Sequence, residues 1–415
     1  MRGIFLLTVS LCLYSATSAV KPDPLEITSL EDYSFEDFVF NFRKSYDSTE
    51  EYEERRDIFH KNLERIFSHN REQATKKGGY LLGINRFADK GPHEMHYGYN
   101  KGSHPAWNQA EAKVSPSRRE LSELPFDLTT DVSELPDSVD WRTNGIVTPV
   151  KDQGMCGSCW AFASTATLES HIALNTGVLF SLSTQELVSC VENPDTCGGT
   201  GGCAGATSEL AYDYLSVYGA LEEDQLGYTS YYGHESSCPS TFETNLRLPR
   251  KFPGAVALIE GFVQLPSNDY VALMNAVAKA GPVAVSVAAS PWSFYSRGVF
   301  DDVSDGSPPA NRDVNHLTVL VGYGTDQDTG EDYWLVRNSW SPTWGEGGYI
   351  RLKRTDPSTL ADPDDDCGMD TTPADGVACT KDEDGNPVVP PAAKTCGTSG
   401  ILFDSVLPVG GSLLL

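Results

Sequence analysis

Two cysteines near the middle of the chain, Cys156 and Cys159, stand in the stretch KDQGMCGSCWAF. A C-x-x-C pair can be a redox couple, one half of a zinc site, or a structural cysteine beside a reactive one. The Ala-rich segment CWAFASTATLESHIAL begins at Cys159 and is expected to form a buried helix. The positive end of that helix dipole would favour a thiolate, so Cys159 is the candidate nucleophile.

A thiol nucleophile is activated further by a histidine, which can hold it as an ion pair. His316 lies in DVNHLTVLVGYG, just before a predicted buried strand, and Asn338 lies in VRNSWSPTWGEGGYIRLKR. An asparagine side-chain carbonyl can accept the imidazole N–H and fix the ring. Each residue alone is more often structural. Together with Cys159 they form a candidate triad, and Trp340 or Trp344 could shield its hydrogen bond from water.

The charge and the N-terminus limit the compartment and the partners. The 415 residues carry a net charge of −27, which argues against nucleic acid or an anionic membrane as a partner. Met1 and Arg2 precede an apolar run over 4–14, so residues 1–19 are predicted to be a secretory signal peptide. No later apolar stretch is long enough for a membrane anchor. We expect the secretory pathway, ending in a lysosome, a vacuole or outside the cell.

The number of cysteines bears on the C-x-x-C pair. Of the ten cysteines, Cys12 leaves with the predicted signal peptide and nine remain. Disulfides are the default in an oxidising compartment, so an odd number suggests one free thiol. Parity alone does not say which cysteine is free.

The chain divides into three stretches of different character. Residues 30–100 are charged and have a helical pattern. Residues 101–134 are polar and rich in proline, serine and acidic residues, which predicts a linker with a processing site. Further on, helical patterns near 159–174 and 205–217 precede strand-like runs after 281. This order predicts an α+β domain with two segregated halves.

These motifs together indicate a family. The stretches DQGMCGSCWAF, VNHLTVLVGYG and RNSWSPTWGEGGYIRLKR resemble papain and the cathepsin L-like cysteine peptidases. The resemblance implies an α+β papain-like fold, in which a helical half and a β-barrel half face each other across the active-site cleft, preceded by a helical inhibitory prodomain. His316 and Asn338 lie 157 and 179 residues after Cys159, farther than is usual in the family, so insertions are expected. One more is expected around 355–400.

The resemblance implies a cysteine endopeptidase, with no cofactor and no metal, and assigns roles at the matching positions. Cys159 would attack the peptide carbonyl. His316 would hold the thiolate as an imidazolium and then protonate the leaving amine, while Asn338 would orient His316. Gln153 would donate its side-chain N–H to the oxyanion, together with the backbone N–H of Cys159.

The N-terminal stretch resembles the propeptides of cathepsin L-like enzymes in two motifs, a spaced helical pattern and the G-x-N-x-F-x-D of GINRFAD. The matching residues are Glu51, Arg55, Phe59, Asn62, Ile66, Asn70, Gly83, Asn85, Phe87 and Asp89. The resemblance implies an inhibitory propeptide over 20–134 and a peptidase domain over 135–415. Cleavage is expected near 130–136, because LPDSVDWR resembles a mature N-terminus.

Substrate-binding positions also follow from the resemblance. They are Gly205, Ala206, Thr207, Ser286, Val314, Asn315, Trp344 and Asp404. Ala206 departs from the family's glycine, so its main-chain contact with substrate depends on the backbone that alanine can adopt. Aligning GILFDSVLPV with the family's C-terminus places Asp404 at the floor of the primary specificity pocket. An acid there would let the enzyme accept arginine as well as bulky apolar side chains at P2.

The resemblance also bears on disulfides and partners. The disulfides that it implies are Cys156–Cys203 and Cys190–Cys238. Three pairings stay open for the remaining cysteines, which are Cys197, Cys367, Cys379 and Cys396. The family's third bridge is expected to be rebuilt, because GSPPANRDVNH has no cysteine. The expected partners of a monomer are protein and peptide substrates, its own propeptide and cystatin-type inhibitors.

Other functions compete with this interpretation. A disulfide oxidoreductase using CGSC would need a thioredoxin-like strand before the motif, which VTPVKDQGM does not provide. A zinc site would need further paired cysteines or histidines. A catalytically silent homologue is disfavoured because all four catalytic positions are present. An exopeptidase is disfavoured because no His-His pair in a long loop would bind a substrate carboxylate.

Overall fold

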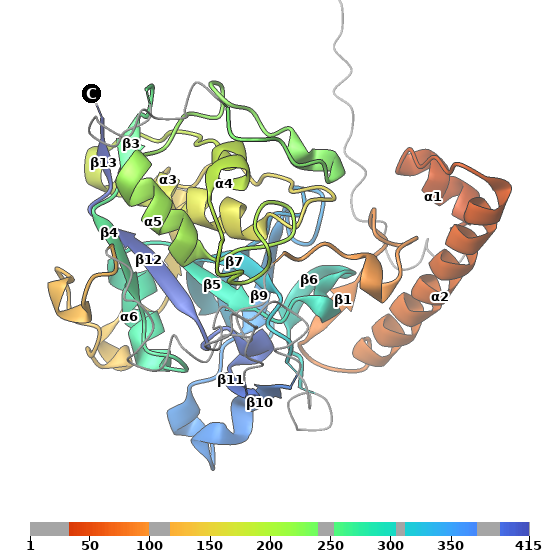
Figure 1. Cartoon of the computed structure of the whole chain (residues 1–415). Helices are drawn as coiled ribbons and strands as arrows, with labels where there is room; N and C mark the ends of the chain where they lie inside the picture. The colour runs from red at the N-terminus through yellow and green to blue at the C-terminus, as the bar shows by residue number, and fades with distance from the viewer. Residues whose placement is uncertain (1–32, 99–116, 240–252, 304–311, 372–390, 415) are drawn as a thin grey trace, which may run out of the picture.

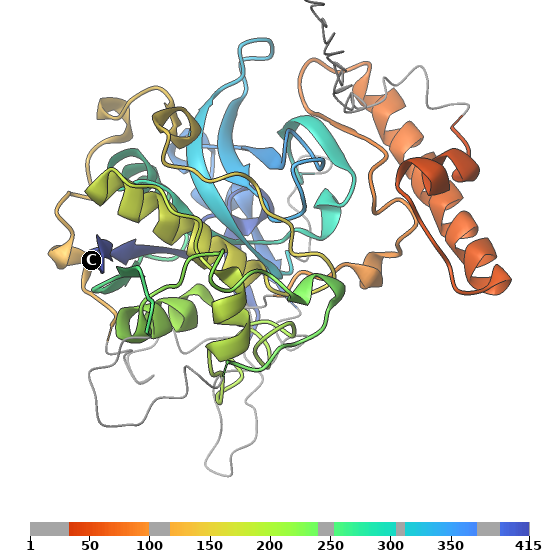
Figure 2. The same ribbon diagram turned by 90° about the horizontal axis from the view of Figure 1, so that it is seen from above.

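The computed structural model describes residues 33–98, 117–239, 253–303, 312–371 and 391–414. The predicted signal peptide, the first part of the expected linker and Cys379 lie outside these residues. In Figure 1 the N-terminal helices stand to one side of a larger body that holds the other helices and the sheet. Figure 2 shows the same separation from above.

Two helices form the N-terminal unit, α1 (Phe35–Asn41) and α2 (Thr49–Gln73). Each begins after a serine whose side chain accepts a backbone N–H of the first turn, Ser34 for α1 and Ser48 for α2. The buried residues of α2 are Phe59, Leu63, Ile66 and Asn70. The side chain of Asn70 exchanges two hydrogen bonds with the backbone of Leu82, of 2.8 and 2.9 Å. These bonds attach strand β1 (Tyr80–Leu82) to the helix.

The helical half of the larger body is built around α3 (Cys159–Thr176). Every residue from Cys159 to Ala173 is buried, and many are alanine, serine or threonine. Small side chains let α4 (Thr184–Cys190) and α5 (Ser208–Tyr218) pack closely against α3. The helix ends at Gly177, which takes the left-handed conformation with a φ of +74°. The helical patterns expected near 159–174 and 205–217 therefore correspond to α3 and α5.

The other half is a sheet with the strand order β1-β6-β9-β8-β7-β5-β12-β4. Its strands are β4 (Gly261–Gln264), β5 (Val283–Val287), β6 (Tyr295–Phe300), β7 (His316–Thr325), β8 (Asp332–Arg337), β9 (Tyr349–Lys353) and β12 (Ser405–Val409), with β2 (Val139–Asp140) also paired to β7. Neighbours are antiparallel except β6 and β9. The helix α6 (Tyr270–Lys279) packs against β7. The expected α+β class with segregated halves is confirmed.

Shorter elements complete the fold. Two small sheets pair β3 (Ala257–Leu258) with β13 (Ser412–Leu413) and β10 (Cys367–Asp370) with β11 (Ala393–Cys396). The 3-10 helices are η2 (Pro92–Glu94), η5 (Leu121–Glu123), η6 (Val132–Glu134), η7 (Trp141–Asn144), η8 (Ser230–Tyr232), η10 (Ser290–Trp292), η11 (Pro357–Thr359), η12 (Pro363–Asp366) and η13 (Thr398–Gly400). Strands β10 and β11 belong to the expected insertion and are joined by the disulfide Cys367–Cys396.

The described residues form two apolar cores. One contains Cys159 and Trp160 with the helical half. The other contains Trp292 and Trp340 with the sheet half, and it also takes in Phe59 of the N-terminal unit. The start of α3 and the start of β7 meet where the two halves join, because the Leu317 N–H points at the Cys159 sulfur. Within the described residues no helix combines the length and the apolar character that a membrane crossing needs.

Candidate active site

Cys159 is the first residue of α3 and is fully buried. Of the described cysteines it alone carries a free thiol. Its Sγ accepts a hydrogen bond of 3.4 Å from the backbone N–H of Leu317, the residue after His316. Burial raises the pKa of the Cys159 thiol to about 12, and the N–H groups directed at the sulfur oppose this rise. The thiol is therefore protonated in the state that the structure describes.

His316 begins β7, and Asn338 follows the last residue of β8, its antiparallel neighbour. The two side chains meet through a hydrogen bond of 2.8 Å between His316 Nε2 and Asn338 Oδ1. Since the amide oxygen can only accept, Nε2 is the donor. The ring of Trp340 lies 4.9 Å from the imidazole, measured between centroids, and shields this bond. Burial lowers the pKa of His316 to about 4, so the ring is neutral.

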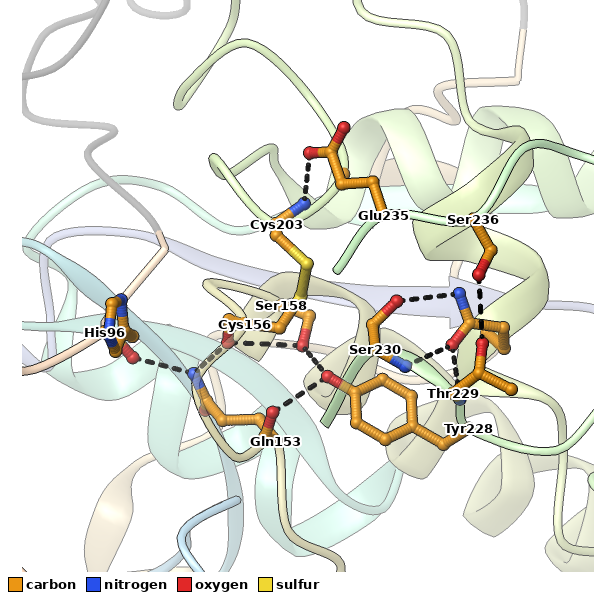
Figure 3. Close-up of a disulfide and its surroundings, with 12 residues drawn as sticks. His96, Gln153, Cys156, Ser158, Cys203, Tyr228, Thr229, Ser230, Glu235 and Ser236 are labelled. Carbon is orange, nitrogen blue, oxygen red and sulfur yellow. Dashed lines mark hydrogen bonds between the residues drawn. A yellow bond between two sulfur atoms is a disulfide. The ribbon is translucent and has the colours of Figure 1, made fainter. Parts of the chain in front are cut away.

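Gln153 lies in the loop before α3, and its side chain has three partners. Nε2 donates to the carbonyls of His96 and Cys156, at 2.8 and 3.0 Å. Oε1 accepts from the hydroxyl of Ser339 at 2.6 Å. Figure 3 shows Gln153 between His96 and the backbone of Cys156. The amide is therefore fixed with its N–H groups toward the start of α3.

The C-x-x-C pair is not a redox couple, because Cys156 is bonded to Cys203 (Figure 3). The Gly157 N–H donates to the Cys203 carbonyl at 2.9 Å, so the bridged loops also pair through their backbones. Cys190 is bonded to Cys238, and Cys367 to Cys396. Cys197 is also disulfide-bonded, while Cys379 lies outside the described residues. Cysteines that a zinc site would require are thus used in disulfides.

The N-terminal unit runs directly over these residues. The carbonyl of His96 accepts from Gln153, and the carbonyl of Tyr97 lies 3.4 Å from His316 Nδ1. Gly98 then passes so close to Gly157 that an added Cβ would lie 2.0 Å from the Gly157 oxygen. Residues 96–98 therefore cover the candidate catalytic groups. The sequence motifs did not indicate them, because these contacts use backbone atoms of residues that follow the last propeptide motif.

The propeptide motif residues hold the covering segment in shape. Arg55 and Asn62 of α2 donate to the carbonyls of Asp89 and Ala88, at 3.1 and 2.9 Å. The Asp89 carboxylate accepts from Lys44 at 2.7 Å. Other motif residues act within the N-terminal unit: Glu51 accepts from the Asp47 N–H, Phe59 and Ile66 are buried, and Asn70 bonds to Leu82. Gly83, Asn85 and Phe87 contact the larger body.

The expected substrate-binding residues fall on both halves. Gly205, with a φ of +98°, and Ala206 precede Thr207, which caps α5. The φ angle of Ala206 is not positive, so an alanine fits at this position without backbone strain. Asn315 bonds the Ala289 N–H and the Ser290 hydroxyl at 3.1 and 2.7 Å. Val314 and Trp344 are buried.

Asp404 directly precedes β12 and lies beside Ser286 of the neighbouring strand β5. The Ser286 hydroxyl donates to Asp404 Oδ2, and the Ser286 N–H donates to the Asp404 carbonyl at 3.0 Å. Gln264 Nε2 donates to Asp404 Oδ1 at 3.3 Å. The carboxylate is thus held by neutral donors in a nearly buried position, with 5% of the residue exposed.

Comparisons with known proteins agree with this geometry. A model of the papain family cysteine proteases matches residues 135–376, and a model of the cathepsin propeptide inhibitor domain (I29) matches residues 35–95. The chain belongs to the papain family of cysteine proteases. Cathepsin L of Sarcophaga peregrina is 36% identical over 350 residues, covering 84% of this chain and 94% of that protein. Procathepsin L of Rattus norvegicus is 34% identical, covering 89% of this chain and 98% of that protein.

A solved structure gives the same result for the fold. The digestive procathepsin L 3 of Tenebrio molitor larval midgut superposes with a TM-score of 0.64 at 29% identity, covering 90% of this chain and 97% of that one. This papain-family protease is therefore a cathepsin L-like zymogen with a papain-like fold. Residues 33–98 are called the prosegment below, and the body from residue 135 onward is called the peptidase domain.

Proposed function

We propose that the mature protease cleaves internal peptide bonds through a Cys159 thiolate paired with a His316 imidazolium. The observation that carries the proposal is the buried hydrogen bond between His316 Nε2 and Asn338 Oδ1, 2.8 Å long, beside the free Cys159. This bond leaves Nδ1 as the nitrogen that can exchange a proton with the thiol and with substrate. Asn338 fixes the tautomer and the ring plane for this exchange.

The chemistry then proceeds in two stages. The Cys159 sulfur attacks the peptide carbonyl carbon, and the C=O electron pair moves to the oxygen. When this oxyanion collapses, the C–N bond breaks, and His316 gives its proton to the leaving amine, which leaves a thioester on Cys159. A water molecule then attacks the thioester carbon while His316 takes its proton. The C–S bond breaks, the acid product leaves, and the Cys159 thiolate and His316 imidazolium are restored.

Gln153 and the Cys159 N–H form the proposed oxyanion site. The His96 carbonyl accepts from Gln153 Nε2 at 2.8 Å, so in the zymogen a prosegment carbonyl takes the place proposed for the substrate oxygen. The contact length is within the range for a donor that stabilises a developing negative charge. Substrate can enter this site only after residues 96–98 have moved.

A covalent inhibitor tests the assignment of the nucleophile. Active-site titration of the matured enzyme with an epoxide inhibitor of cysteine proteases should consume one equivalent, abolish activity and modify Cys159. Peptide mapping identifies the modified residue. Modification of another cysteine, or retained activity after complete labelling of Cys159, would refute the mechanism.

Asp404 is proposed to let the enzyme accept arginine at P2. Support comes from its nearly buried position beside Ser286, since a guanidinium is well suited to a carboxylate held among neutral donors. A P2 substrate library should show that Asp404→Ala and Asp404→Asn lose arginine cleavage and keep cleavage of bulky apolar residues. Unchanged acceptance of arginine in both variants would show that Asp404 does not set this preference.

Maturation is proposed to be self-catalysed in an acidic compartment of the secretory pathway, namely a lysosome or a vacuole, or after secretion. An ion pair between Lys44 and Asp89 lies within the prosegment, and one between Arg86 and Asp152 joins the prosegment to the peptidase domain. The acidic balance of the chain motivates the proposal that self-processing occurs below about pH 5. Purified Cys159→Ala proenzyme should not mature under these conditions. Maturation of this variant at the wild-type rate would exclude self-processing.

A further inference from the structure

Residues 117–134, called the strap here, lie outside both regions that match known families, 35–95 and 135–376. In Figure 1 the strap runs along the side of the body beside β4 and α6, far from α1 and α2. Its polar sequence predicts a loose linker, but every other one of its residues from 124 to 132 is partly covered by the peptidase domain. The strap therefore needs a structural explanation of its own.

The first part of the strap pairs with the edge of the sheet. β4 is the last strand in the sheet order, and the backbone N–H and C=O of Phe262 in this strand both form hydrogen bonds with the strap. The Phe262 N–H donates to the Ser117 carbonyl at 3.0 Å, and the Arg119 N–H donates to the Phe262 carbonyl at 2.8 Å. A Cβ added to Gly261 would lie 2.0 Å from the Ser117 oxygen, so a glycine is required for this approach. The strap thus covers an edge that would otherwise be open.

The second part of the strap alternates in burial like a strand with one buried face. Residues 125, 127, 129 and 131 are exposed, whereas the even-numbered residues between 124 and 132 are half-buried. The apolar side chains on the inward face pack against the core of the sheet half, and they are Leu124, Phe126, Leu128 and Val132. This regular alternation is the pattern of a docked segment, because an unattached linker would have no inward face.

Helix α6 supplies polar groups that match the strap backbone. Asn275, which is fully buried, donates from Nδ2 to the Thr130 carbonyl at 2.8 Å. Lys279 donates from Nζ to the Asp127 carbonyl at 2.8 Å. Loss of the strap would remove an acceptor from a buried amide, which costs free energy. The surface of α6 is therefore complementary to this segment in apolar area and in hydrogen bonds.

The contacts of the strap differ in kind from those of residues 96–98, which must leave. The strap bonds to Phe262 of β4 and to Asn275 and Lys279 of α6, whereas the prosegment reaches Gln153 and His316 through residues 96 and 97, so activation gains nothing from removing the strap. We propose that the strap stays bound to β4 and α6 after activation as an integral part of the mature enzyme. The cut that frees the inhibitory segment then falls before Ser117, earlier than the site near 130–136 that the family resemblance implies. The proposal rests on the zymogen processing proposed above.

A cleavable full-length chain tests strap binding without relying on self-processing. In the Cys159→Ala proenzyme, recognition sites for a sequence-specific protease are inserted before Ser117 and after Glu134, and both are cut. Size-exclusion chromatography and mass spectrometry of each fraction then locate the strap peptide. It should elute with the peptidase domain. Elution as a free peptide, while a chain cut only before Ser117 stays folded, would overturn the proposal.

Matched variants test whether the inward-facing side chains of the strap hold it on the peptidase domain. Phe126→Ser with Leu128→Ser, on the inward face, should lower the retained strap fraction by about tenfold, since two buried apolar side chains are lost. Thr129→Ser, on the exposed face, keeps the hydroxyl that bonds to Asp127 and should leave the retained fraction unchanged. Equal retention in the inward-face pair and in this control would overturn the proposal.

The unmodified enzyme provides the second measurement. After maturation, its native mass and N-terminal sequence should include residues 117–134. A mature N-terminus between residues 130 and 136, with no strap peptide bound, would overturn the proposal. Failure of the chain to mature would count against self-processing, and the cleavable chain would still decide whether the strap is retained.

Discussion

The prosegment covers both side chains of the proposed catalytic pair. Burial raises the pKa of Cys159 to about 12 and lowers that of His316 to about 4, which disfavours the ion pair that the proposed chemistry requires. The cause is removal from water, to which the ring of Tyr97 contributes by packing against the imidazole, whereas the Tyr97 carbonyl near Nδ1 opposes the fall in the pKa of His316. Departure of the prosegment should therefore switch on the ion pair at the same moment that it admits substrate.

Asn338→Ala should lower kcat/KM by about 10- to 100-fold, because a hydrogen bond to a charged group contributes about 1.5–3 kcal/mol. The imidazolium loses its acceptor, so the alkaline limb of the pH–rate profile should move to lower pH. Steady-state kinetics of the matured enzyme from pH 4 to 9 measure both effects. Epoxide titration of the variant checks that it is correctly folded. A fall in kcat/KM with an unmoved pH profile would indicate a packing role for Asn338 only.

Ser339 is a positioning residue that the sequence motifs did not indicate. Its hydroxyl donates to Gln153 Oε1 at 2.6 Å and so fixes which end of the amide faces the oxyanion site. Ser339→Ala should lower kcat about tenfold with little change in KM, because the donor is needed mainly in the transition state. Ser339→Thr should retain most of the activity. Equal losses in both variants would point to steric disruption instead.

At the scale of elements, the sequence predicts best what local spacing controls. Cys159 opens α3 and His316 opens β7, as expected, because the helical and strand patterns on either side are strong. Covering of the site by residues 96–98 could not be predicted, since it depends on where the chain passes after α2. The sequence predicts a linker for residues 117–134 because their composition is polar. The alternating burial of the strap depends on its contacts with β4 and α6, which the sequence alone does not indicate.

One ion pair joins the prosegment to the loop that carries Gln153. The Arg86 guanidinium forms two hydrogen bonds with the Asp152 carboxylate, and both side chains are about four-fifths buried, with 23% and 22% exposed. Asp152 also accepts from the Gly154 N–H at 3.0 Å. The prosegment is therefore anchored one residue away from the proposed oxyanion donor, on the part of the enzyme that it inhibits.

Arg86→Ala should speed acid maturation and weaken inhibition by the prosegment by about tenfold, as expected for loss of a bidentate charged pair. The control is Arg56→Ala, since Arg56 pairs with Glu53 within α2 and is more exposed. Time courses of processing at several pH values measure the rate. Similar rates for both variants would mean that Arg86 contributes nothing to latency.

At the scale of the whole molecule, buried carboxyl groups link stability to pH. Burial raises the pKa of Glu186 to about 7 and that of Asp366 to about 6, and it also raises the pKa of Asp302. Asp366 faces Arg312, which opposes the shift, and Asp302 and Asp301, which reinforce it, while Lys353 opposes it weakly. With a net charge of −27 on the chain, ionisation at neutral pH adds further repulsion.

The sign of the pH dependence follows from proton binding. Between about pH 4, where Asp366 ionises in the unfolded chain, and about pH 6, where it ionises in the folded one, the folded state holds the extra proton. The contribution of Asp366 to stability should therefore fall as pH rises through this interval and stay low above it. Burial lowers the pKa of His171 and His316 to about 4, so these two groups act in the opposite direction over the same interval. The contribution of Asp366 is therefore measured as the difference in Tm between Asp366→Asn and its parent, the Cys159→Ala proenzyme. This difference should shift in favour of Asp366→Asn by several degrees between pH 4.5 and pH 7, because the asparagine stays neutral. The same difference at both pH values would show that Asp366 does not contribute to the pH dependence.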